Sequence, residues 1–201
     1  MENVYFIAGL GNPGPEYAAT RHNIGFVLVD RLAARWRATW ALERKFKARL
    51  ARVERDGRKV ILGQPRTFMN ASGEAVGAVG RFYQLPPGRI LIVVDDADLP
   101  VGQLRMRPEG SSGGHHGLES VEQQLGTRGY PRLRLGIGRA GERREITDYV
   151  LGRFKAAERK TMEEVLDRAV RQVECWLEAG IAEAMNEFNG AVTAPAEKGK
   201  Q

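Results

Sequence analysis

The sequence predicts a single three-layer α/β domain, and three observations lead to this fold class. Apolar segments typical of strands alternate with amphipathic segments typical of helices. The 201 residues contain neither an internal repeat nor a linker long enough to separate two domains. A chain of this length can also bury a sizeable core without disulfides. We therefore expect one domain over residues 1–190 and a disordered tail over residues 191–201, because the last residues lack apolar anchors.

Several segments have the apolar or alternating pattern of strands. The clearest is Arg89–Asp95, an uninterrupted apolar run that ends in acidic residues and is typical of a buried central strand. The dipeptide Asp56-Gly57 joins two other segments and indicates a hairpin. The expected strands are 4–8, 48–55, 58–63, 89–95, 102–107 and 131–137.

Helices are expected where apolar residues recur every three or four positions. Ile24, Leu28, Leu32 and Trp36 have this spacing and predict a helix over 23–38. We expect Ser72 to cap a helix that ends near Tyr83, before Pro86-Pro87-Gly88. A helical stripe runs from Met162 to Leu177, and Cys175 lies opposite it, which predicts an exposed thiol. The remaining expected helices are 116–125 and 180–188.

The composition favours some classes of partner and excludes others. The formal net charge is +6, and Arg supplies 24 of the 31 cationic residues. Because guanidinium matches phosphate oxygens, this favours a phosphate or nucleic-acid partner, although the surplus is modest. One Cys excludes an internal disulfide and a Cys-cluster zinc site. No apolar run approaches the roughly 20 residues of a membrane span. An acid replaces the basic start of a signal peptide, so we expect a cytoplasmic protein.

A glycine-rich segment follows the first expected strand. Gly9-Leu-Gly11-Asn-Pro13-Gly14 matches the dinucleotide-binding pattern G-x-G-x-x-G, with Asp30 downstream. In that pattern the acidic residue ends a second strand, whereas Asp30 lies inside an expected helix. Pro13 and Pro15 also make the segment a rigid turn. We therefore favour a structural or substrate-side loop over nucleotide binding.

Acidic residues cluster at the carboxyl end of the clearest strand, in Asp95-Asp-Ala-Asp98. Ligands of open α/β sheets bind at this edge. A solvated turn is one interpretation of the cluster. The other pairs Asp95 with His22: the carboxylate orients one ring nitrogen, and the other nitrogen takes a proton from water. No Ser or Cys has a nucleophile-elbow pattern, so this pair indicates direct attack by water.

A second loop, Gly110-Ser-Ser-Gly-Gly114, precedes His115 and His116 at the start of an expected helix. Its backbone N–H groups could bind an anion or a carbonyl oxygen. The alternative is a flexible turn in which Gly supplies positive φ. Adjacent histidines on a helix point about 100° apart and lack a metal-binding spacing, which disfavours metal.

Three further segments have both a functional and a structural interpretation. Pro65–Asn70 ends in one amide, although Phe68 and Met69 are residues typical of a core. Residues 35–59 hold ten Lys or Arg against three acids, either a second contact surface or a solvated helix and hairpin. Alternating Arg residues occupy the two strands that flank the second glycine-rich loop and could meet a phosphate or simply face solvent. They are Arg105, Arg107, Arg132 and Arg134.

Together these segments resemble one family, the bacterial peptidyl-tRNA hydrolases. The opening motif Gly9–Gly14 is followed by Tyr17 and by Thr20-Arg-His-Asn-Ile-Gly25. Further motifs follow in the family's order, over about residues 3–190. They are Thr67-Phe-Met-Asn-Ala-Ser-Gly73, Asp95-Asp-Ala-Asp-Leu-Pro100, Gly113-Gly-His-His-Gly-Leu118, Arg132-Leu-Arg-Leu-Gly-Ile-Gly138 and Val150-Leu-Gly152.

The resemblance implies a monomeric, metal-independent esterase that needs no cofactor and binds no membrane. It implies a mixed central β-sheet flanked by helices, as in phosphorylase/hydrolase-like domains. Such an enzyme cleaves the ester between a nascent peptide and the terminal ribose of tRNA, which recycles tRNA from stalled translation. His22 is implied as the general base and Asp95 as its stabiliser, while Asn12 distinguishes N-blocked substrates. The residues implied in substrate or tRNA binding are Tyr17, Phe68, Met69, Asn70, Gly113, His116, Arg107 and Arg134.

This chain departs from the family at one site position, since His116 stands where the family usually has Asn. An imidazole is larger than an amide and titrates, so the departure bears on affinity and pH dependence. Arg107 also replaces what is often Lys. The rival hypothesis is an RNA-binding protein on the same scaffold, as among plastid relatives that assist intron splicing. Retention of His22, Asp95, Asn12 and Asn70 argues against it, because binding alone needs no catalytic pair.

Overall fold

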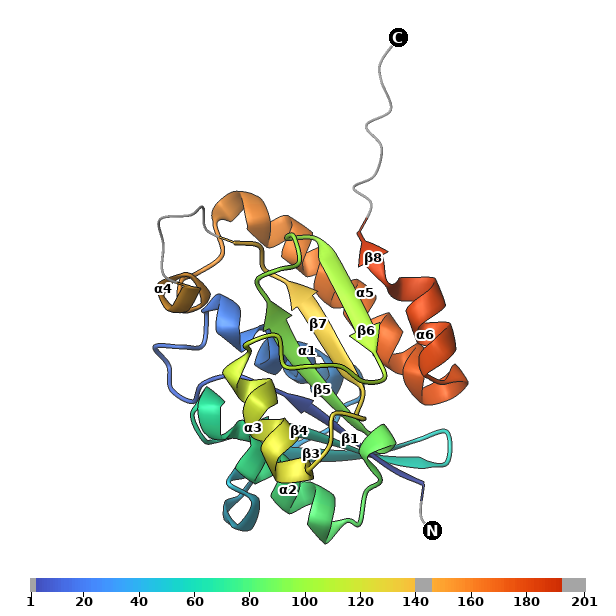
Figure 1. Ribbon diagram of the computed structural model, residues 1–201. Helices are drawn as coiled ribbons and strands as arrows, with labels where there is room; N and C mark the ends of the chain where they lie inside the picture. The colour runs from blue at the N-terminus through green and yellow to red at the C-terminus, as the bar shows by residue number, and fades with distance from the viewer. Residues whose placement is uncertain (1–2, 140–145, 193–201) are drawn as a thin grey trace.

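A computed structural model of the chain describes residues 3–139 and 146–192. One β-sheet forms the middle layer, and helices cover both of its faces (Figure 1). This arrangement confirms the predicted three-layer α/β class. The strands are β1 (Val4–Gly9), β2 (Trp40–Glu43), β3 (Ala48–Arg55), β4 (Arg58–Pro65), β5 (Ile90–Asp96), β6 (Gln103–Arg107), β7 (Arg132–Gly136) and β8 (Gly190–Ala191).

The sheet is mixed, with parallel strands at its centre and antiparallel strands at both margins. Its strand order is β2-β3-β4-β1-β5-β7-β6-β8. Strands β4, β1, β5 and β7 pair in parallel, whereas β2, β3, β6 and β8 pair antiparallel to their neighbours. The carboxyl ends of the four parallel strands therefore share one edge, which is where open α/β sheets bind ligands.

Two hydrophobic cores lie on opposite faces of this sheet. Helices α1 and α5 pack on one face, and α2 and α3 pack on the other (Figure 1). The helices are α1 (Ile24–Arg35), α2 (Ser72–Phe82), α3 (His116–Leu125), α4 (Ile146–Val150), α5 (Ala156–Ala179) and α6 (Ile181–Phe188). Short 3-10 turns are η1 (Arg21–Asn23), η2 (Arg44–Phe46), η3 (Met69–Ala71) and η4 (Pro87–Arg89).

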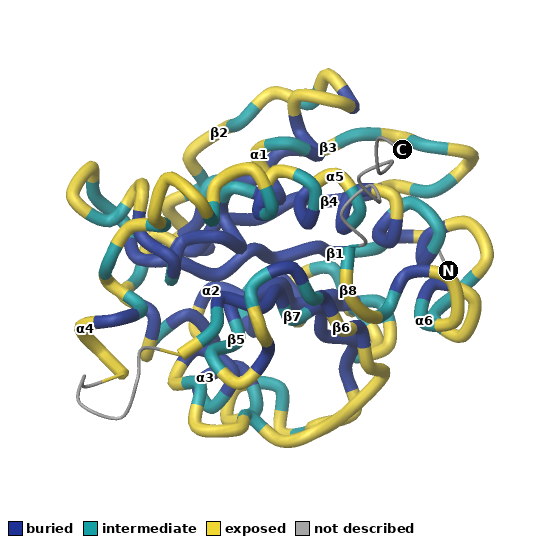
Figure 2. The backbone as a smooth tube through the Cα atoms, turned by 90° about the horizontal axis from the view of Figure 1, so that it is seen from above, coloured by how far each residue is buried: buried dark blue, intermediate teal, exposed yellow. Residues whose placement is uncertain are grey.

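Strand β5 contributes to both cores because successive side chains of a strand point to opposite faces. Leu91 and Val93 pack with α1 and α5, while Ile92 and Val94 pack with α2 and α3. Figure 2 shows the central strands as a buried band between exposed outer segments. The apolar run of β5 is therefore the signature of a strand covered on both faces.

Most expected elements are present within a few residues of their predicted bounds, including β3, β6, α3 and α6. The helix expected over 23–38 ends earlier, at Arg35, because Arg37 adopts a positive φ of 54°. Strands β2 and β8 and helix α4 were not predicted, since each is short and has no clear periodicity.

The predicted tail falls mainly on residues 193–201, outside the described residues. Among the helices of residues 3–139 and 146–192, none is long and apolar enough to span a bilayer.

Two side-chain predictions were wrong. Ser72 does not cap α2: it is the first helical residue, it is buried, and the capping position is held by Ala71 without a side-chain hydrogen bond. The turn η3 feeds directly into the helix and takes the place of a cap. Cys175 is half-buried and packs against the core beneath α5 rather than being exposed, because α6 folds back over that helix.

The glycine pattern after β1 is explained by close packing. A Cβ at Gly9 would lie 2.1 Å from the carbonyl oxygen of Gly25, so the strand and the start of α1 touch through their backbones. Asp30 lies inside α1, as predicted, and not at the end of a second strand. The pattern therefore brings the amino end of α1 onto the sheet edge, and His22 lies just before that end.

Candidate active site

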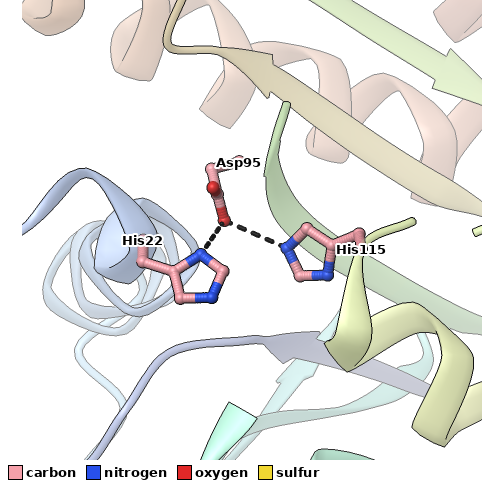
Figure 3. Close-up of side chains that lie close together, drawn as sticks. All are labelled: His22, Asp95 and His115. Carbon is pink, nitrogen blue, oxygen red and sulfur yellow. Dashed lines mark hydrogen bonds and ion pairs between the residues drawn. The ribbon is translucent and has the colours of Figure 1, made fainter. Parts of the chain in front are cut away.

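Three side chains meet at the carboxyl edge of the sheet, and each comes from a different element. His22 lies on η1, Asp95 ends the buried part of β5, and His115 immediately precedes α3. His22 Nδ1 lies 2.8 Å from Asp95 Oδ1, and His115 Nε2 lies 3.1 Å from the same oxygen (Figure 3). The structure therefore brings together the predicted His22–Asp95 pair and adds a second histidine to it.

The hydrogen bonds of His115 fix its protonation state. Its Nδ1 accepts from the backbone N–H groups of Gly117 and Leu118, at 3.1 and 3.4 Å. Nδ1 is therefore unprotonated, and Nε2 carries the proton that it donates to Asp95. Because both ring nitrogens are engaged, His115 has no lone pair left for a proton from water. His22 differs, since its only hydrogen-bond partner in the described part of the chain is Asp95.

Asp95 is ionised in this arrangement. Burial alone would raise the pKa of its carboxyl group, but the hydrogen bonds and charges of His115 and His22 outweigh burial and hold the pKa well below its usual range. An ionised carboxylate only accepts hydrogen bonds, so His22 must donate from Nδ1. The Nε2 atom of His22 is then the free acceptor of the cluster, as a general base requires.

The same cluster has the residue types of a metal site. One ligand atom each from His22, Asp95 and His115 lie within 4.8 Å of one another. A histidine that binds metal through one nitrogen normally donates a hydrogen bond from the other. His115 cannot do so, because its Nδ1 accepts from two backbone N–H groups. The hydrogen bonds of the three residues therefore fit a carboxylate held between two imidazole rings better than they fit a set of metal ligands.

The neighbours of His22 hold η1 in place. Arg21 is buried and donates to Glu158 at 2.9 Å and to the carbonyl oxygen of Arg153 at 2.6 Å. On the other side, Asn23 accepts from the backbone N–H of Asn12 and donates to its carbonyl oxygen, both at 2.9 Å. The position of His22 is therefore set by contacts with α5 and with the loop after β1.

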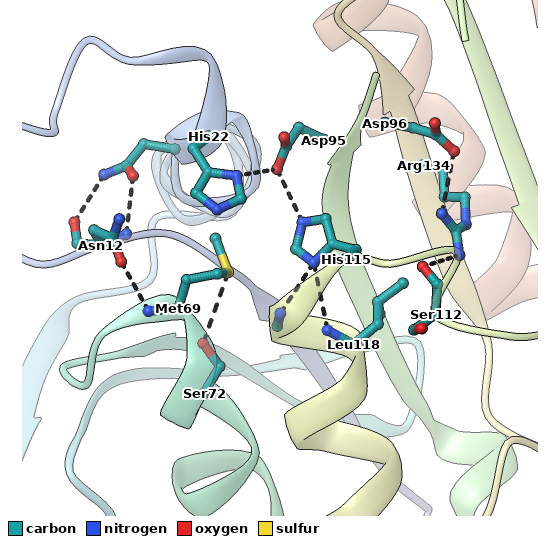
Figure 4. A network of polar contacts seen from close by, with 12 residues as sticks. Asn12, His22, Met69, Ser72, Asp95, Asp96, Ser112, His115, Leu118 and Arg134 are labelled. Carbon is teal, nitrogen blue, oxygen red and sulfur yellow. Dashed lines mark hydrogen bonds and ion pairs between the residues drawn. The ribbon is translucent and has the colours of Figure 1, made fainter. Parts of the chain in front are cut away.

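Asn12 presents a fixed donor to the site. Its side-chain oxygen accepts from the backbone N–H of Met69 at 2.7 Å, which identifies Oδ1 and leaves the Nδ2 amide group free (Figure 4). Among the described residues no acceptor occupies this Nδ2 group. Asn12 therefore offers N–H donors to an oxygen in the cleft.

The loop before α3 is organised by Arg134. Its guanidinium donates to Asp96 at 3.1 Å and to the carbonyl oxygens of Ser111 and Ser112 at 2.8 and 3.1 Å (Figure 4). Gly113 and Gly114 adopt positive φ of 62° and 78°, so this loop does use glycine for its turn, as the structural interpretation proposed. Two N–H groups at the start of α3 bind the imidazole of His115, which leaves fewer for an external anion.

The four alternating Arg residues have different surroundings. Arg132 is buried and donates to the carbonyl oxygens of Tyr130 and Arg128. Arg107 faces it across the β6–β7 pair but is exposed and has no side-chain partner among the described residues. Arg105 pairs in the same way with Arg134. Arg132 is therefore structural, whereas Arg107 is available to a ligand.

A cleft of about 250 Å³ contains most of these groups. Helix α4 forms one wall through Ile146, Thr147 and Val150. The predicted site residues that line the cleft are Asn12, His22, Asp95, Gly113, His116 and Arg134. The others lie around it: Met69 is buried beneath Asn12, Phe68 and Asn70 are exposed on the next turn, and Tyr17 and Arg107 do not line the cleft.

Sequence reasoning missed the role of His115. Its capping of α3 could have been suspected, because a polar side chain just before a helix often accepts from the first N–H groups. The adjacent His116 has a different partner, since its Nδ1 lies 3.0 Å from Glu119 Oε2. The sequence predicted that the two histidine rings point in different directions, but it did not predict that His115 contacts Asp95 and His116 contacts Glu119.

Part of the basic stretch over residues 35–59 is paired within the protein. Arg35 pairs with Glu174 at 2.9 Å, Arg52 with Glu43 at 2.9 Å and Lys47 with Glu74 at 2.6 Å. These contacts connect α1 with α5 and the hairpin with α2. They favour the structural interpretation of this stretch over a second contact surface.

Comparison with known proteins gives one consistent result. A family model described as peptidyl-tRNA hydrolase matches residues 6–197. The peptidyl-tRNA hydrolase of Synechococcus sp. (strain JA-3-3Ab) is 50% identical over 183 residues, which cover 91% of this chain and 81% of that protein. The one from Gloeobacter violaceus is 45% identical over 189 residues, which cover 94% and 95%. A crystal structure of peptidyl-tRNA hydrolase from Acinetobacter baumannii superposes with a TM-score of 0.89 at 37% identity and covers 95% of this chain and 97% of that one.

Proposed function

The chain belongs to the peptidyl-tRNA hydrolase family, and from this premise we propose that His22 and Asp95 activate the water that cleaves its substrate. The enzyme hydrolyses peptidyl-tRNA, a carboxylic ester of tRNA. The main support for the proposed mechanism is the carboxylate shared by two histidines. Asp95 binds both His22 and His115, but only His22 keeps a free ring nitrogen.

In the proposed reaction, His22 Nε2 removes a proton from water while the water oxygen attacks the ester carbonyl carbon. Asp95 stabilises the imidazolium that forms. When the tetrahedral intermediate collapses, the bond between the carbonyl carbon and the ribose oxygen breaks, and the imidazolium returns its proton to that oxygen. The products are tRNA and the carboxylic acid of the peptide, which releases its proton to solvent and becomes a carboxylate. General-base assistance of this kind supplies roughly 10²–10⁴ in rate.

Asn12 is the proposed determinant for N-blocked substrates. Its free Nδ2 group can donate to the carbonyl oxygen of the amide that joins the esterified residue to the rest of the peptide. Free aminoacyl-tRNA has an ammonium group there and no carbonyl acceptor. The ammonium would also leave the donor of Asn12 unsatisfied, which costs binding free energy.

The acceptor-end phosphate is proposed to lie on the side of Arg134, with Gly113 and His116 at the loop and Arg107 beyond it. Arg107 supports this assignment because its guanidinium is exposed and unpartnered in the described structure. Arg134 also holds the loop, so its role is both structural and electrostatic. Tyr17, Phe68, Met69 and Asn70 remain proposed contacts with the ester, the peptide end or the terminal base.

We further propose that the enzyme acts as a monomer in the cytoplasm and needs no metal ion. The hydrogen bonds of His115 support the last point, because a metal ion at Nε2 would displace the proton there. Either that proton moves to Nδ1 and both backbone hydrogen bonds are lost, or the ring gives up its one N–H proton and becomes an imidazolate. A chelator should therefore leave turnover unchanged.

The test is turnover of N-acetylaminoacyl-tRNA compared with free aminoacyl-tRNA carrying the same residue. We expect rapid release of the acetylated residue and little release of the free one. Tight binding of the acetylated substrate without turnover would contradict the proposal and favour the RNA-binding alternative. Loss of turnover with a chelator, restored by metal, would contradict the metal-independent mechanism.

A further inference from the structure

A second cavity of about 260 Å³ lies beside the catalytic cleft, and Asn12 lines both. Its walls come from the loop after β1, from α1, and from the strands β3 and β4. Because β4 runs parallel to β1, the end of β4 lies at the same sheet edge as the catalytic residues. The residues that matter here are Phe26, Asp30, Arg49, Gln64 and Arg66.

The strand order determines the sequence in which the site residues follow one another along the cleft. Along the sheet edge, Arg134 belongs to β7, Asp95 to β5 and Asn12 to the loop after β1, and Figure 4 shows these side chains in this order across the view. The second cavity continues the same line over β4 and β3. Peptidyl-tRNA has the same linear order of nucleotide, ester and peptide. With the acceptor-end phosphate toward Arg134, the peptide therefore extends past Asn12 into the second cavity.

The wall of this cavity is polar and partly pre-organised. Gln64 is only 2% exposed; its Nε2 donates to the carbonyl oxygen of Phe26 at 3.2 Å, and its Oε1 accepts from Arg49 at 3.2 Å. A buried amide held in this way presents a fixed polar surface to a ligand. Arg49 also lies over the ring of Trp40, with its guanidinium carbon 5.2 Å from the ring centroid.

Two charged residues of this cavity have no partner in residues 3–139 and 146–192. Arg66 is exposed at the end of β4, and Asp30 is exposed on α1. Neither makes a hydrogen bond or ion pair with another described side chain. An exposed guanidinium without a partner can pair with a carboxylate of a ligand, and Asp30 can do the same with a cation.

We propose that this cavity binds the residues of the nascent peptide immediately upstream of the esterified residue, and that Arg66 makes acidic side chains preferred there over basic ones. This inference rests on the proposed function, because it takes peptidyl-tRNA as the ligand. An extended peptide advances about 3.3 Å per residue, so side chains close to the ester reach the cavity once the first carbonyl meets Asn12. Asp30 lines the same cavity and repels acidic side chains, so it reduces the preference for acidic residues that Arg66 creates.

The experiment uses N-acetylated tripeptidyl-tRNAs that share Ala at the ester and carry two Glu, two Gln or two Lys upstream of it. The wild-type kcat/KM for the Glu substrate should exceed that for the Lys substrate roughly two- to fivefold, as expected for an exposed ion pair. Arg66→Gln should bring this ratio close to one, and Asp30→Asn should raise it. Arg37→Gln, an exposed residue at the opposite end of α1, is the matched control and should leave the ratio unchanged.

The outcomes separate this inference from the proposed function. A wild-type ratio of one or less, or equal ratios in the wild type and Arg66→Gln, would overturn the peptide subsite while hydrolysis itself continues. A loss of preference in Arg37→Gln as large as in Arg66→Gln would also overturn it, because the effect would then reflect overall charge. If the wild type hydrolyses none of the three substrates and not N-acetyl-Ala-tRNA either, the proposed function itself is wrong.

Discussion

The two halves of the substrate cleft differ in how their charged side chains are paired. In the catalytic half, over β5 and β7, polar atoms bond mainly to one another: Asp95 binds both histidines, and Arg134 binds Asp96 and the loop carbonyls. In the upstream half, over β4 and β3, Arg66 and Asp30 have no partner within the described structure. The catalytic groups are thus positioned before substrate arrives, while the upstream charges are left for the ligand.

This difference has a direct functional meaning. A pre-organised site avoids reorganisation during the reaction, so changes there should alter the rate for every substrate. Unpartnered exposed charges contribute little to the fold, so changes there should alter only the preference among substrates.

The largest effect is expected for the base itself. His22→Ala should lower kcat roughly 10²–10⁴-fold on every blocked substrate, because the water loses its proton acceptor. His115→Ala removes one hydrogen bond to a charged carboxylate and should cost only about tenfold. The measurement is single-turnover hydrolysis of N-acetylaminoacyl-tRNA, with circular dichroism to verify folding.

Comparison of the two variants separates the positioning role of His115 from the role of a base. His115→Ala keeps His22 and its free Nε2, so its loss in kcat should be much smaller than that of His22→Ala. Equal losses in the two folded variants would mean that the two histidines have the same role.

The next effect concerns stability. The pKa of Asp95 in the folded protein lies below the value of about 3.9 expected in the unfolded chain. Its ionised form therefore stabilises the fold above about pH 4, and this contribution is lost as the pH falls through the folded pKa. The difference in free energy of unfolding between wild type and Asp95→Asn should be about 1 kcal/mol larger at pH 7 than at pH 3. Denaturant titrations at both pH values measure it, and equal differences would contradict an ionised Asp95.

The smallest effect is expected outside both halves, at Arg107. In a His22→Ala background that binds without turnover, Arg107→Gln should reduce the slope of log K against log salt by about one for all tRNAs. Arg58→Gln, at the first residue of β4 beside the hairpin turn, provides the control. An unchanged slope would show that Arg107 contacts no phosphate.

The sequence was sufficient to predict the central strands, the helices with clear periodicity and the pairing of His22 with Asp95. It succeeded there because buried strands and amphipathic helices have strong patterns, and because an acid directly after a buried run must lie at the sheet edge. Short elements such as β2 and α4 have too few residues for a pattern. Their existence depends on pairing and packing with distant parts of the chain.

The second histidine and the upstream cavity could not be predicted for a different reason. The contact of His115 with Asp95 depends on how the loop before α3 folds, and Arg134 fixes that loop through backbone carbonyls that carry no sequence signal. The upstream cavity joins Asp30 of α1 with Gln64 and Arg66 at the end of β4, and these residues are far apart in the sequence. Net charge was also misleading, because it does not distinguish cations that are paired within the protein, such as Arg35, Lys47 and Arg52, from one without a described partner, such as Arg66.

The proposed mechanism requires the free ring nitrogen of His22 to take the proton from the attacking water. Chemical rescue can show this: hydrolysis of N-acetylaminoacyl-tRNA by His22→Ala is measured with increasing imidazole in the buffer. We expect very slow turnover without imidazole and a rate that rises with the concentration of neutral imidazole, since the base is then supplied from solution. Turnover close to wild type in the folded variant without imidazole would contradict it.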